Sequence, residues 1–524
     1  MPGAFILAID QGTTSTRAIL FDAGSRPVAM AQHALPQIFP AHGWVEHDPE
    51  DIWAATVKVC REVLARHAGP VAGIGITNQR ETVVVWDRAT GRAIHNAVVW
   101  QDRRTADRCR AMFEAGDEPE VTARTGLILD PYFSATKIGW ILDHADARER
   151  AKRGELAAGT IDSFLLWRLT GGRVHATDAT NAARTALFNI HTGTWDSNLL
   201  RLFGVPASLL PEVCDNAAEF GSTDAAILGE AIPVRAMAGD QQAALVGHAC
   251  FAPGMLKCTY GTGAFMIANT GDQPVASSHR LLTTIGYRLG GRVTYALEGS
   301  IFVTGAAIQW LRDGLRLFAD AAETEALAAS VADSGGVYVV PALTGLGAPH
   351  WDSAARGLIC GLDRAATAAH VVRATLEAVA FQTRDLIGAM RGDGVAQMPA
   401  LRVDGGMAAN AWLMQCLADV IGLPVARAEI AETTALGVAN LAAMQAGLRG
   451  SLAELATTYR AGRTWEPMMA DPIRDSLLAG WDDAVRRTRS GMIVRLRCDR
   501  RRRRCCRVPS RRARRGRSGC GRCR

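Results

Sequence analysis

Short apolar runs separated by polar turns open the chain. Residues 5–9 and 18–21 form two such runs, and the turn between them carries an acid, a glycine and three hydroxyl side chains: Asp10, Gly12, Thr13, Thr14 and Ser15. Apolar runs of this length around a tight turn predict a β-hairpin. A plain hairpin is one interpretation of this stretch, and a ligand site built on its turn is the other.

The turn of this hairpin has the chemistry of a phosphate site. Gly12 lets the backbone approach an anion closely. Amide and hydroxyl donors would come from three consecutive residues, Thr13, Thr14 and Ser15. Arg17 adds a positive charge, and Asp10, at the strand end, is placed to hold hydrated Mg²⁺.

The same plan recurs in the middle of the chain. Two strand-like segments, residues 255–260 and 264–270, flank a glycine-threonine turn, Gly261-Thr262-Gly263. Strand, turn and strand are again predicted, and two related halves are therefore implied. Two phosphate-binding turns, one in each half, are the layout expected of a clamp that closes on a nucleotide from both sides.

A third stretch predicts a strand, a Gly-Gly turn and an apolar helix. Residues 401–404 form the strand, and the helix covers 411–421 and ends before Gly422 and Pro424. Gly405 and Gly406 would allow a flat base or ribose to lie on the backbone at the helix start. The alternative is a turn that serves tight packing only.

Helices alternate with strands elsewhere, which predicts the α/β class. One helix is expected from Pro49 to residue 68, with Asp48 as its cap and the proline in its first turn. No lysine follows a glycine, so the standard P-loop class is excluded. Residues 71–78 approach a dinucleotide fingerprint but lack its third glycine, so no Rossmann fold follows.

Length and composition fit a globular enzyme. The 524 residues predict two or three domains, and the hydrophobic share is 48%. No uncharged apolar run reaches the about 18 to 20 residues that span a bilayer, and the first residues do not resemble a signal peptide. The seven cysteines before residue 490 are odd in number and scattered. We therefore expect a cytoplasmic protein with reduced thiols.

Positive charge is concentrated at the end of the chain. Residues 486–524 hold 18 arginines against one acid, Asp499, whereas the preceding residues are net acidic. An arginine block is typical of a disordered arm that binds nucleic acid through phosphates. It is also what out-of-frame translation of a GC-rich gene yields, and we favour this second interpretation. No nucleic-acid partner is therefore expected unless the tail is genuine.

Asp240 is the best candidate for a general base. It follows Gly239 at the end of a predicted strand, and the apolar residues behind it predict a helix. The amino end of a helix keeps a carboxylate ionised, as a base requires. From this stretch alone, an ordinary helix cap is the stronger interpretation.

Two clusters suit the binding of a small polyol. Arg80 and Glu81 place a cation beside an anion after an apolar strand and could fix neighbouring hydroxyls. Trp100, with charged residues behind it, could cover carbon-bound hydrogens. Tyr132 follows a proline turn and has a phenol available to a hydroxyl. Either charged cluster could instead be a salt-bridged surface strand end.

These segments together resemble the FGGY carbohydrate kinase family, within the actin and hexokinase fold group. The resemblance covers residues 4 to about 485 in order and rests on these motifs: Asp10-Gln-Gly-Thr-Thr-Ser, Gly43-Trp-Val-Glu-His-Asp-Pro49, Asn78-Gln-Arg-Glu-Thr82, Trp100-Gln-Asp-Arg-Arg-Thr105, Pro131-Tyr-Phe-Ser-Ala-Thr-Lys137, Gly239-Asp-Gln-Gln242, Thr259-Tyr-Gly-Thr-Gly263, Glu298-Gly-Ser and Asp404-Gly-Gly. Within the family, three of them favour glycerol over pentoses or gluconate: those beginning at Asn78, Trp100 and Pro131.

The resemblance implies an α/β protein with two actin/hexokinase-like (ribonuclease H-like) domains, residues 1–249 and 250–485, and an active site in the cleft between them. Residues 486–524 would be a tail beyond the family's usual end. The implied activity is ATP:glycerol 3-phosphotransfer, with ATP and Mg²⁺ as cofactors. A homo-oligomer, dimer or tetramer, is expected. Another polyol or sugar kinase and an actin-like ATPase remain as alternatives.

Residue roles follow from the same resemblance. Asp240 would be the catalytic base, and glycerol would contact Arg80, Glu81, Trp100, Tyr132, Asp240, Gln241 and Phe265. The nucleotide would contact Thr13, Thr14, Ser15, Arg17, Thr262, Gly305, Gln309, Gly406 and Asn410. The sequence pattern around Gly305 and Gln309 predicts only a buried helix start, so the resemblance alone singles these two out.

Overall fold

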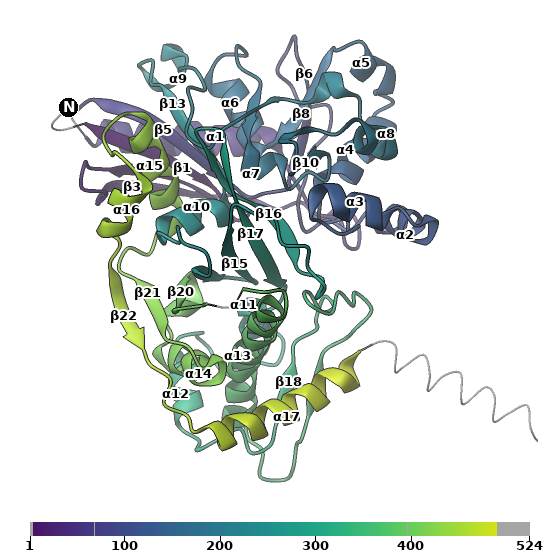
Figure 1. Ribbon diagram of the computed structural model, residues 1–524, viewed down its shortest axis with the longest axis vertical. Helices are drawn as coiled ribbons and strands as arrows, with labels where there is room; N and C mark the ends of the chain where they lie inside the picture. Colours follow the sequence, from purple (N-terminus) through teal and green to yellow (C-terminus); the bar gives the residue numbers. More distant parts are fainter. Residues whose placement is uncertain (1–3, 68, 396, 490–524) are drawn as a thin grey trace, which may run out of the picture.

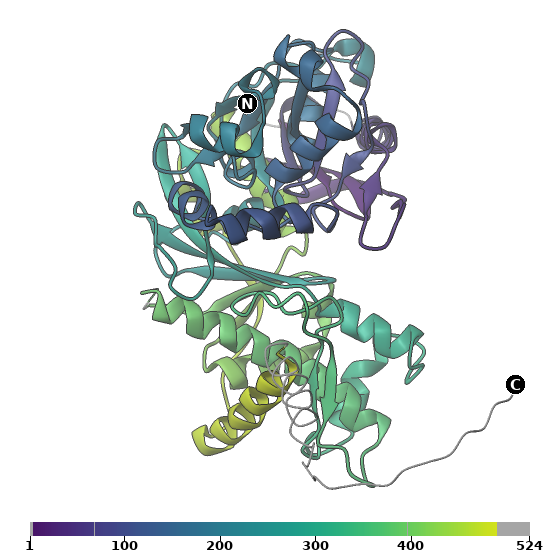
Figure 2. The ribbon, with the colours of Figure 1, turned by 90° about the vertical axis from the view of Figure 1, so that its right-hand side faces the viewer.

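Residues 4–67, 69–395 and 397–489 are described by the computed structural model. They form two halves that are stacked along the long axis of the molecule, with a narrower region between them (Figures 1 and 2). Residues 490–524, which make up most of the predicted basic tail, lie outside the described residues.

A five-stranded sheet lies at the centre of the N-terminal half, in the order β13-β5-β1-β2-β3. Its strands are β1 (Phe5–Gln11), β2 (Ser15–Phe21), β3 (Pro27–Ala34), β5 (Val71–Asn78) and β13 (Val234–Gly239). β1 and β2 are the first predicted hairpin, which is confirmed. β1, β5 and β13 run parallel, so their carboxyl ends share one edge of the sheet. The residues that follow these three strands are thereby brought together.

Both faces of this sheet are buried, which explains why its strands are almost continuously apolar. Leu7 and Ile9 of β1 face α1 (Pro49–Ala65) and α6 (Ile161–Leu169). Ile6 and Ala8 face the opposite side, where α10 (Asp240–Gly247) and α15 (Thr433–Gln445) pack. The predicted helix from Pro49 is confirmed and ends three residues early, and the Asp48 side chain accepts a hydrogen bond from the Glu50 amide over 2.8 Å.

A smaller four-stranded sheet extends the N-terminal half, in the order β4-β7-β6-β8. Its strands are β4 (Glu46–His47), β6 (Val83–Asp87), β7 (Ala97–Val98) and β8 (Leu156–Thr160). The short helices of this half are α2 (Ala106–Ala115), α3 (Glu118–Thr125), α4 (Ser134–His144), α5 (Arg148–Lys152), α7 (Ala179–Ala182), α8 (Ser197–Phe203), η1 (Ala207–Leu209) and α9 (Ala225–Leu228). Two strand pairs complete this half: β9 (Ala176–Asp178) with β12 (Glu212–Cys214), and β10 (Phe188–Asn189) with β11 (Thr194–Trp195).

A seven-stranded sheet organises the C-terminal half, in the order β16-β17-β15-β14-β20-β21-β22. Its strands are β14 (Leu256–Tyr260), β15 (Ala264–Gly271), β16 (Leu282–Leu289), β17 (Arg292–Ile301), β20 (Leu401–Asp404), β21 (Val425–Ala428) and β22 (Ala461–Trp465). β14 and β15 are the second predicted hairpin, which is also confirmed. β14 and β20 run parallel, so the Gly261–Gly263 turn and the Gly405-Gly406 turn leave the same edge.

Helices cover this second sheet and close the half. They are α11 (Gly305–Asp313), α12 (Glu323–Ala329), α13 (Ala368–Gly392), η2 (Gly406–Ala409), α14 (Ala411–Ile421) and α17 (Asp471–Thr488), together with the hairpin β18 (Tyr338–Val340) and β19 (Leu358–Cys360). α16 (Leu452–Thr458) lies instead beside the N-terminal half, where Leu452 packs against the same cluster as α10 and α15 (Figure 1). The third predicted element, strand 401–404 followed by helix 411–421, is confirmed, and Gly422 ends the helix in a left-handed conformation. α17 includes Arg486 and Arg487, the first two residues expected in the tail.

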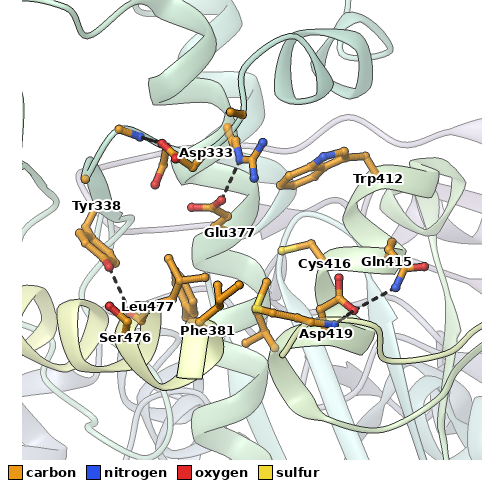
Figure 3. Close-up of a pocket in the computed structure, with 18 of the residues that line it drawn as sticks. Asp333, Tyr338, Glu377, Phe381, Trp412, Gln415, Cys416, Asp419, Ser476 and Leu477 are labelled. Atoms are coloured by element: carbon orange, nitrogen blue, oxygen red, sulfur yellow. Dashed lines mark hydrogen bonds and ion pairs between the residues drawn. The ribbon is translucent and has the colours of Figure 1, made fainter. Parts of the chain in front are cut away.

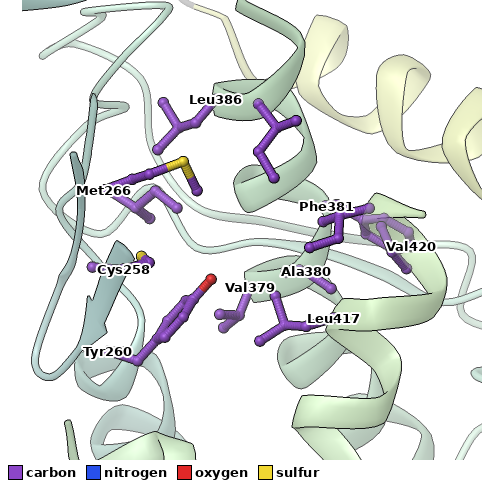
Figure 4. Packing of buried hydrophobic residues seen from close by; sticks show 14 of the residues in the cluster. Cys258, Tyr260, Met266, Val379, Ala380, Phe381, Leu386, Leu417 and Val420 are labelled. Atoms are coloured by element: carbon purple, nitrogen blue, oxygen red, sulfur yellow. The ribbon is translucent and has the colours of Figure 1, made fainter. Parts of the chain in front are cut away.

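The core of the C-terminal half lies between β14, β15 and the long helix α13 (Figure 4). Cys258 and Met266 face Leu386 and Val379 across the sheet–helix interface. The Tyr260 hydroxyl is buried there and hydrogen-bonds to the Thr383 hydroxyl over 2.9 Å, as a buried phenol requires. This packing fixes the start of the Gly261–Gly263 turn.

One helix of the C-terminal segment packs on the N-terminal half. α15, yellow-green in Figure 1, lies against α10, β1, β5 and β13. The two helices approach through glycines, because a Cβ on Gly437 would lie 1.8 Å from the Ala243 carbonyl oxygen and one on Gly247 2.0 Å from that of Thr433. Glycine at the crossing therefore permits the close approach of α15 to α10.

None of the helices described is long and apolar enough to cross a membrane. The seven cysteines of the described residues are all free thiols, and five of them are buried: Cys60, Cys109, Cys250, Cys258 and Cys416. The predicted absence of a disulfide framework is thus confirmed for this part of the chain.

Candidate active site

The first predicted phosphate turn joins β1 to β2. The Gly12 amide donates to the Ser15 carbonyl over 2.9 Å, which closes the turn. Thr14 is exposed and Thr13 half-buried, whereas Ser15 is buried and its hydroxyl accepts a hydrogen bond from Gln32. Arg17, two residues along β2, ion-pairs with Glu432 at 3.1 Å and with Asp10 at 3.5 Å. The turn therefore combines free donors with a cation at one sheet edge.

The C-terminal half presents its own turn at the junction. The amides of Thr304 and Ala306 donate to the Thr262 carbonyl, each over 3.0 Å, and the Gly305 amide donates to that of Gly261 over 3.1 Å. The predicted helix start at Gly305 is confirmed and lies directly on the β14–β15 turn, but its predicted burial is wrong, because Gly305 is only half-buried. Gln309 is exposed one turn along α11.

The Gly405-Gly406 turn lies beside this helix start. The Met407 sulfur would be 3.5 Å from a Cβ placed on Gly305, so the two segments are in contact. Asn410 caps α14 by accepting from the Leu413 amide over 2.9 Å. Gly406 is exposed, and a Cβ added to it would meet nothing within 4 Å. Thr262, Gly305, Gly406 and Asn410 thus border one surface of the C-terminal half.

Asp10 lies in a net negative environment. Burial raises the pKa of its carboxyl to about 7, and Glu432 and Asp240 raise it further while Arg17 opposes them. Nearby positive charge would reverse this shift. Among the residues described, no group of three or more histidine, cysteine, aspartate or glutamate side chains could hold a metal by itself. A single carboxylate is nevertheless the usual protein contribution to Mg²⁺ that is held mainly by phosphates and water, and Asp10 fits that donor set.

Asp240 lies at the edge where β1, β5 and β13 end. It is the first residue of α10, with Gly239 in the cap position, so the interpretation as an ordinary cap is wrong. Its Oδ1 atom accepts from the Gln241 amide over 2.7 Å and lies 3.2 Å from the Arg80 Nε atom. The side chain is about one-third exposed, unlike its buried neighbours. It is therefore the carboxylate of this cluster that a ligand can reach.

Arg80 and Glu81 follow β5 and are buried. Glu81 adopts a φ of 60°, and the Thr82 amide donates to the Arg80 carbonyl over 2.7 Å, so the two side chains leave a tight turn. Burial raises the pKa of the Glu81 carboxyl, and Arg80 and Arg184 only partly oppose the rise. A left-handed non-glycine residue in a packed site is typical of functional positions.

Both charged residues belong to a larger ion-pair network. Arg80 holds Glu298 of β17 through both terminal nitrogens, at 2.5 and 3.0 Å. Arg184 donates to Glu81 over 2.6 Å and to Glu298 over 2.9 Å. Although burial alone would raise the pKa of Glu298, the two guanidinium groups lower it to about 2. Glu298 is therefore an anion shared by two cations of the other half.

An aromatic wall adjoins this network. The Trp100 ring lies 5.7 Å from that of Tyr132 and 5.7 Å from that of Phe265, both edge-on. Phe265 comes from β15, so the wall, like the ion network, is built from both halves. The Tyr132 hydroxyl is 3.4 Å from an Arg80 nitrogen. The structure thus brings together three aromatic residues that are far apart in the sequence.

The charges that follow Trp100 have a structural role. Arg104 and Asp102 are fully buried and pair at 2.8 Å, while Arg103 pairs with Asp130 at 2.8 Å. The alternative that this cluster is a salt-bridged surface strand end is confirmed for the salt bridges but not for the surface, because Arg104 and Asp102 are buried. Asp130 also accepts from the Tyr132 amide over 2.9 Å, so these pairs support the loop that carries the tyrosine.

Three charged residues near the site carried no assigned role in the sequence: Arg184, Lys257 and Glu298. Lys257 is buried, and its ammonium donates to the Gln241 side-chain oxygen and, over 2.9 Å, to the Thr259 hydroxyl. Lysine is only a donor, so this contact fixes which end of the Gln241 amide is free. Glu298 lies in a recognised motif, but no local signal connects any of the three to Arg80.

A cavity of about 900 Å³ lies elsewhere in the C-terminal half, between α13, α14 and α17 (Figure 3). Tyr338, Phe381 and Trp412 line it together with Glu377, which is held by Arg373 over 2.9 Å. None of the predicted site residues lines this cavity. It is therefore separate from the candidate active site.

Two family models match consecutive parts of the chain: the N-terminal domain of the FGGY family of carbohydrate kinases over residues 5–247, and the C-terminal domain of that family over residues 256–446. The chain is 63% identical over 491 residues to the glycerol kinase of Rhodospirillum centenum, covering 93% of this chain and 98% of that one. It is 60% identical over 490 residues to glycerol kinase 1 of Pseudomonas aeruginosa, covering 93% and 99%.

Among solved structures, the fold is similar to that of Plasmodium falciparum glycerol kinase with ADP. The TM-score is 0.87 at 35% identity, over 93% of this chain and 98% of that one. Each half carries a strand–turn–strand hairpin and matches one of the two domain models, so the chain belongs to the FGGY family of carbohydrate kinases.

Proposed function

We propose that the protein transfers the γ-phosphoryl group of ATP to a terminal hydroxyl of glycerol and forms sn-glycerol 3-phosphate. The observation that carries this proposal is the meeting of Arg80, Asp240 and the Trp100–Phe265 wall at the junction of the two halves. A cation, an accessible carboxylate and an apolar wall within one small site suit a short polyol. The full-length identity to proteins named glycerol kinase supports the same substrate.

In the proposed mechanism, Asp240 accepts the proton of the attacking glycerol hydroxyl. That oxygen forms a bond to the γ-phosphorus as the bond from phosphorus to the β,γ-bridging oxygen breaks, and ADP leaves with the electron pair. Arg80, Glu81, Tyr132 and Gln241 would orient the hydroxyls, and Trp100 and Phe265 would exclude water from the carbons. Exclusion of water favours transfer to glycerol over hydrolysis.

The nucleotide would lie between the two turns. Thr13, Thr14, Ser15 and Arg17 would contact its phosphates, and Thr262, Gly305, Gln309, Gly406 and Asn410 would hold the remainder. Mg²⁺, which neutralises charge on the transferred group in such reactions, would be held by Asp10. The position of that carboxyl beside the β1–β2 turn, with the carboxylates of Glu432 and Asp240 nearby, supports a cation there.

The test is ADP release by the purified protein with Mg²⁺ and ATP, with and without glycerol, beside the Asp240→Asn variant. Glycerol-dependent release that falls about a hundredfold to ten-thousandfold in the variant is expected for loss of a general base. Glycerol binding should persist in the variant. Normal turnover by Asp240→Asn would remove the base assignment, and release without glycerol would favour an actin-like ATPase. A panel of pentoses, gluconate and polyols separates glycerol from other acceptors of the family.

We further propose that the enzyme acts in the cytoplasm as a dimer or tetramer. Its use of ATP and its free thiols support the location. Light scattering over a range of protein concentrations tests the assembly, and a constant monomer mass would contradict it.

A further inference from the structure

The proposed glycerol ligands Arg80 and Glu81 are neighbours of opposite charge. A cation and an anion on consecutive buried residues attract each other strongly, and a closed pair would leave little for a substrate to bind. In the structure the two side chains do not form a hydrogen-bonded ion pair, because the Arg80 Nε atom lies 4.0 Å from Glu81 Oε1, beyond hydrogen-bonding distance. Some other contact must hold the two side chains apart.

Two further charged residues supply that contact. Glu298 engages both terminal nitrogens of Arg80, at 2.5 and 3.0 Å, and Arg184 engages Glu81 at 2.6 Å. Arg184 also bonds Glu298 at 2.9 Å, so the four residues form a chain of alternating charge that is open between Arg80 and Glu81. Arg184 and Glu298 are fully buried, which makes these contacts strong and fixed in direction.

We propose that Glu298 and Arg184 are positioning residues for the polyol: Glu298 draws the Arg80 guanidinium away from Glu81, and Arg184 draws the Glu81 carboxylate away from Arg80, so the two proposed ligands are kept from pairing with each other. Arg80, Glu81 and Arg184 belong to the N-terminal half, whereas Glu298 comes from β17 of the C-terminal half. The acceptor site is therefore complete only when the two halves are in contact. Neither positioning residue touches the substrate in this account.

The network also bears on Asp240. The Arg80 guanidinium reaches Asp240 with its Nε atom at 3.2 Å, and its two terminal nitrogens are already held by Glu298. Arg80 thus offers Asp240 one edge contact and cannot form a bidentate pair with it. Without Glu298, the Arg80 guanidinium would be free to form a closer ion pair with either nearby acid, Glu81 or Asp240.

The inference rests on the proposed function, and steady-state kinetics of Glu298→Gln tests it. We expect the KM for glycerol to rise about tenfold or more while the KM for ATP changes less than about twofold, because only the acceptor ligands move. Arg184→Met should act in the same direction, and Arg184→Lys, which keeps the charge, should recover part of the loss. A purely structural role would lower kcat through fewer active molecules and leave both KM values unchanged.

A double variant gives the sharper test. Because Glu298 acts through Arg80, adding Glu298→Gln to Arg80→Ala should raise the glycerol KM less than about threefold beyond Arg80→Ala alone. If the two substitutions instead raised the glycerol KM by independent factors that multiply in the double variant, the inference would be overturned. An unchanged glycerol KM in Glu298→Gln would overturn it as well. If Glu298→Gln does not fold, Glu298→Asp decides: its shorter side chain cannot reach both nitrogens, so an unchanged glycerol KM would again overturn the inference.

Glu377→Gln is the matched control. Glu377 is another buried carboxylate that pairs with an arginine, Arg373, at 2.9 Å, but it lines the cavity between α13, α14 and α17. Its loss should lower stability and leave the glycerol KM unchanged. Failure of the wild-type protein to release ADP with glycerol would end the proposed function. Wild-type activity with an unaffected Glu298→Gln variant would end only the positioning role.

Discussion

The indole N–H of Trp100 donates to the Thr13 hydroxyl over 2.9 Å. One residue of the proposed glycerol wall is thereby bonded to the proposed phosphate turn. The Trp100 backbone amide also donates to the Thr82 hydroxyl over 3.1 Å, so the same residue is tied to the segment that carries Arg80 and Glu81. Trp100 thus connects the acceptor ligands to the turn between β1 and β2.

Trp100→Phe should separate these two roles. The smaller ring can still pack against Tyr132 and Phe265 but cannot donate to Thr13. Loss of one neutral hydrogen bond costs about 0.5–1.5 kcal/mol, so kcat/KM for ATP should fall about twofold to tenfold, with a smaller change in the KM for glycerol. Trp195→Phe, which removes a 2.8 Å indole bond to the Pro211 carbonyl away from the site, is the control. Equal kinetic effects of both substitutions would show that the Thr13 contact has no special role.

Arg80→Ala should weaken glycerol binding and also destabilise the protein. Charge-assisted hydrogen bonds to the substrate are each worth about 1.5–3 kcal/mol, so the KM for glycerol should rise about tenfold or more. The substitution also leaves Glu298 with one cation instead of two, and breaking such a buried pair costs about 3–5 kcal/mol. Kinetics and thermal denaturation measure the two effects. Arg153→Ala, at an exposed ion pair, should change neither, and an unchanged glycerol KM in Arg80→Ala would contradict its assigned role.

The local elements of this site could be predicted from the sequence. The two hairpins and the Gly405-Gly406 turn rest on apolar runs and turn residues that are adjacent in the chain, and each is where the pattern predicts it. The convergence of Arg80 and Asp240 could not be deduced in this way. It follows from the parallel order of β1, β5 and β13, which the sequence does not state.

The ion-pair network was the part of the site that could least be predicted from the sequence. Arg184 follows the short helix α7, and Glu298 lies inside a strand, where a charged residue gives no sign of its partner. Their pairing spans 114 residues and both halves of the molecule. Burial of each charge is tolerated only because all four members of the ion-pair network are present, and that condition exists in the folded state alone. Gly305 and Gln309 required the family resemblance for a similar reason.

His47 should give the protein an acid-sensitive contribution to stability. Burial lowers the pKa of this imidazole from 6.5 to about 4. Because the folded-state value is the lower one, the neutral ring stabilises the fold above pH 6.5, and the contribution is lost as the pH falls from about 6.5 to 4. The loss amounts to at most about 3 kcal/mol over that range.

Melting temperatures of the wild type and His47→Gln between pH 7.5 and 5 measure this contribution. The wild type should lose more stability than the variant on acidification, since the variant has no ring to protonate. His33→Gln, at an exposed position of β3, should follow the wild type. Parallel curves for wild type and His47→Gln would contradict the assignment to His47.

Two glycines of the proposed nucleotide site should respond differently to alanine. A Cβ on Gly305 would lie 2.5 Å from the Gly261 carbonyl oxygen, so Gly305→Ala must push α11 away from the β14–β15 turn. A backbone oxygen cannot move aside as a flexible side chain can. We therefore expect Gly305→Ala to lower the melting temperature and to raise the KM for ATP, because overpacking of this kind costs about 1–3 kcal/mol.

Gly406→Ala should leave the fold intact, since its added methyl would meet no protein atom within 4 Å. If the nucleotide lies on the backbone at Gly406, the methyl group occupies that space and the KM for ATP should rise with an unchanged melting temperature. Gly447→Ala provides no comparison because its φ of 70° adds strain, whereas Gly388, in the middle of α13, has open space and an ordinary φ. Gly388→Ala is therefore the control and should leave the KM for ATP unchanged. An ATP KM that is equally unchanged in Gly406→Ala would place the nucleotide elsewhere on the C-terminal half.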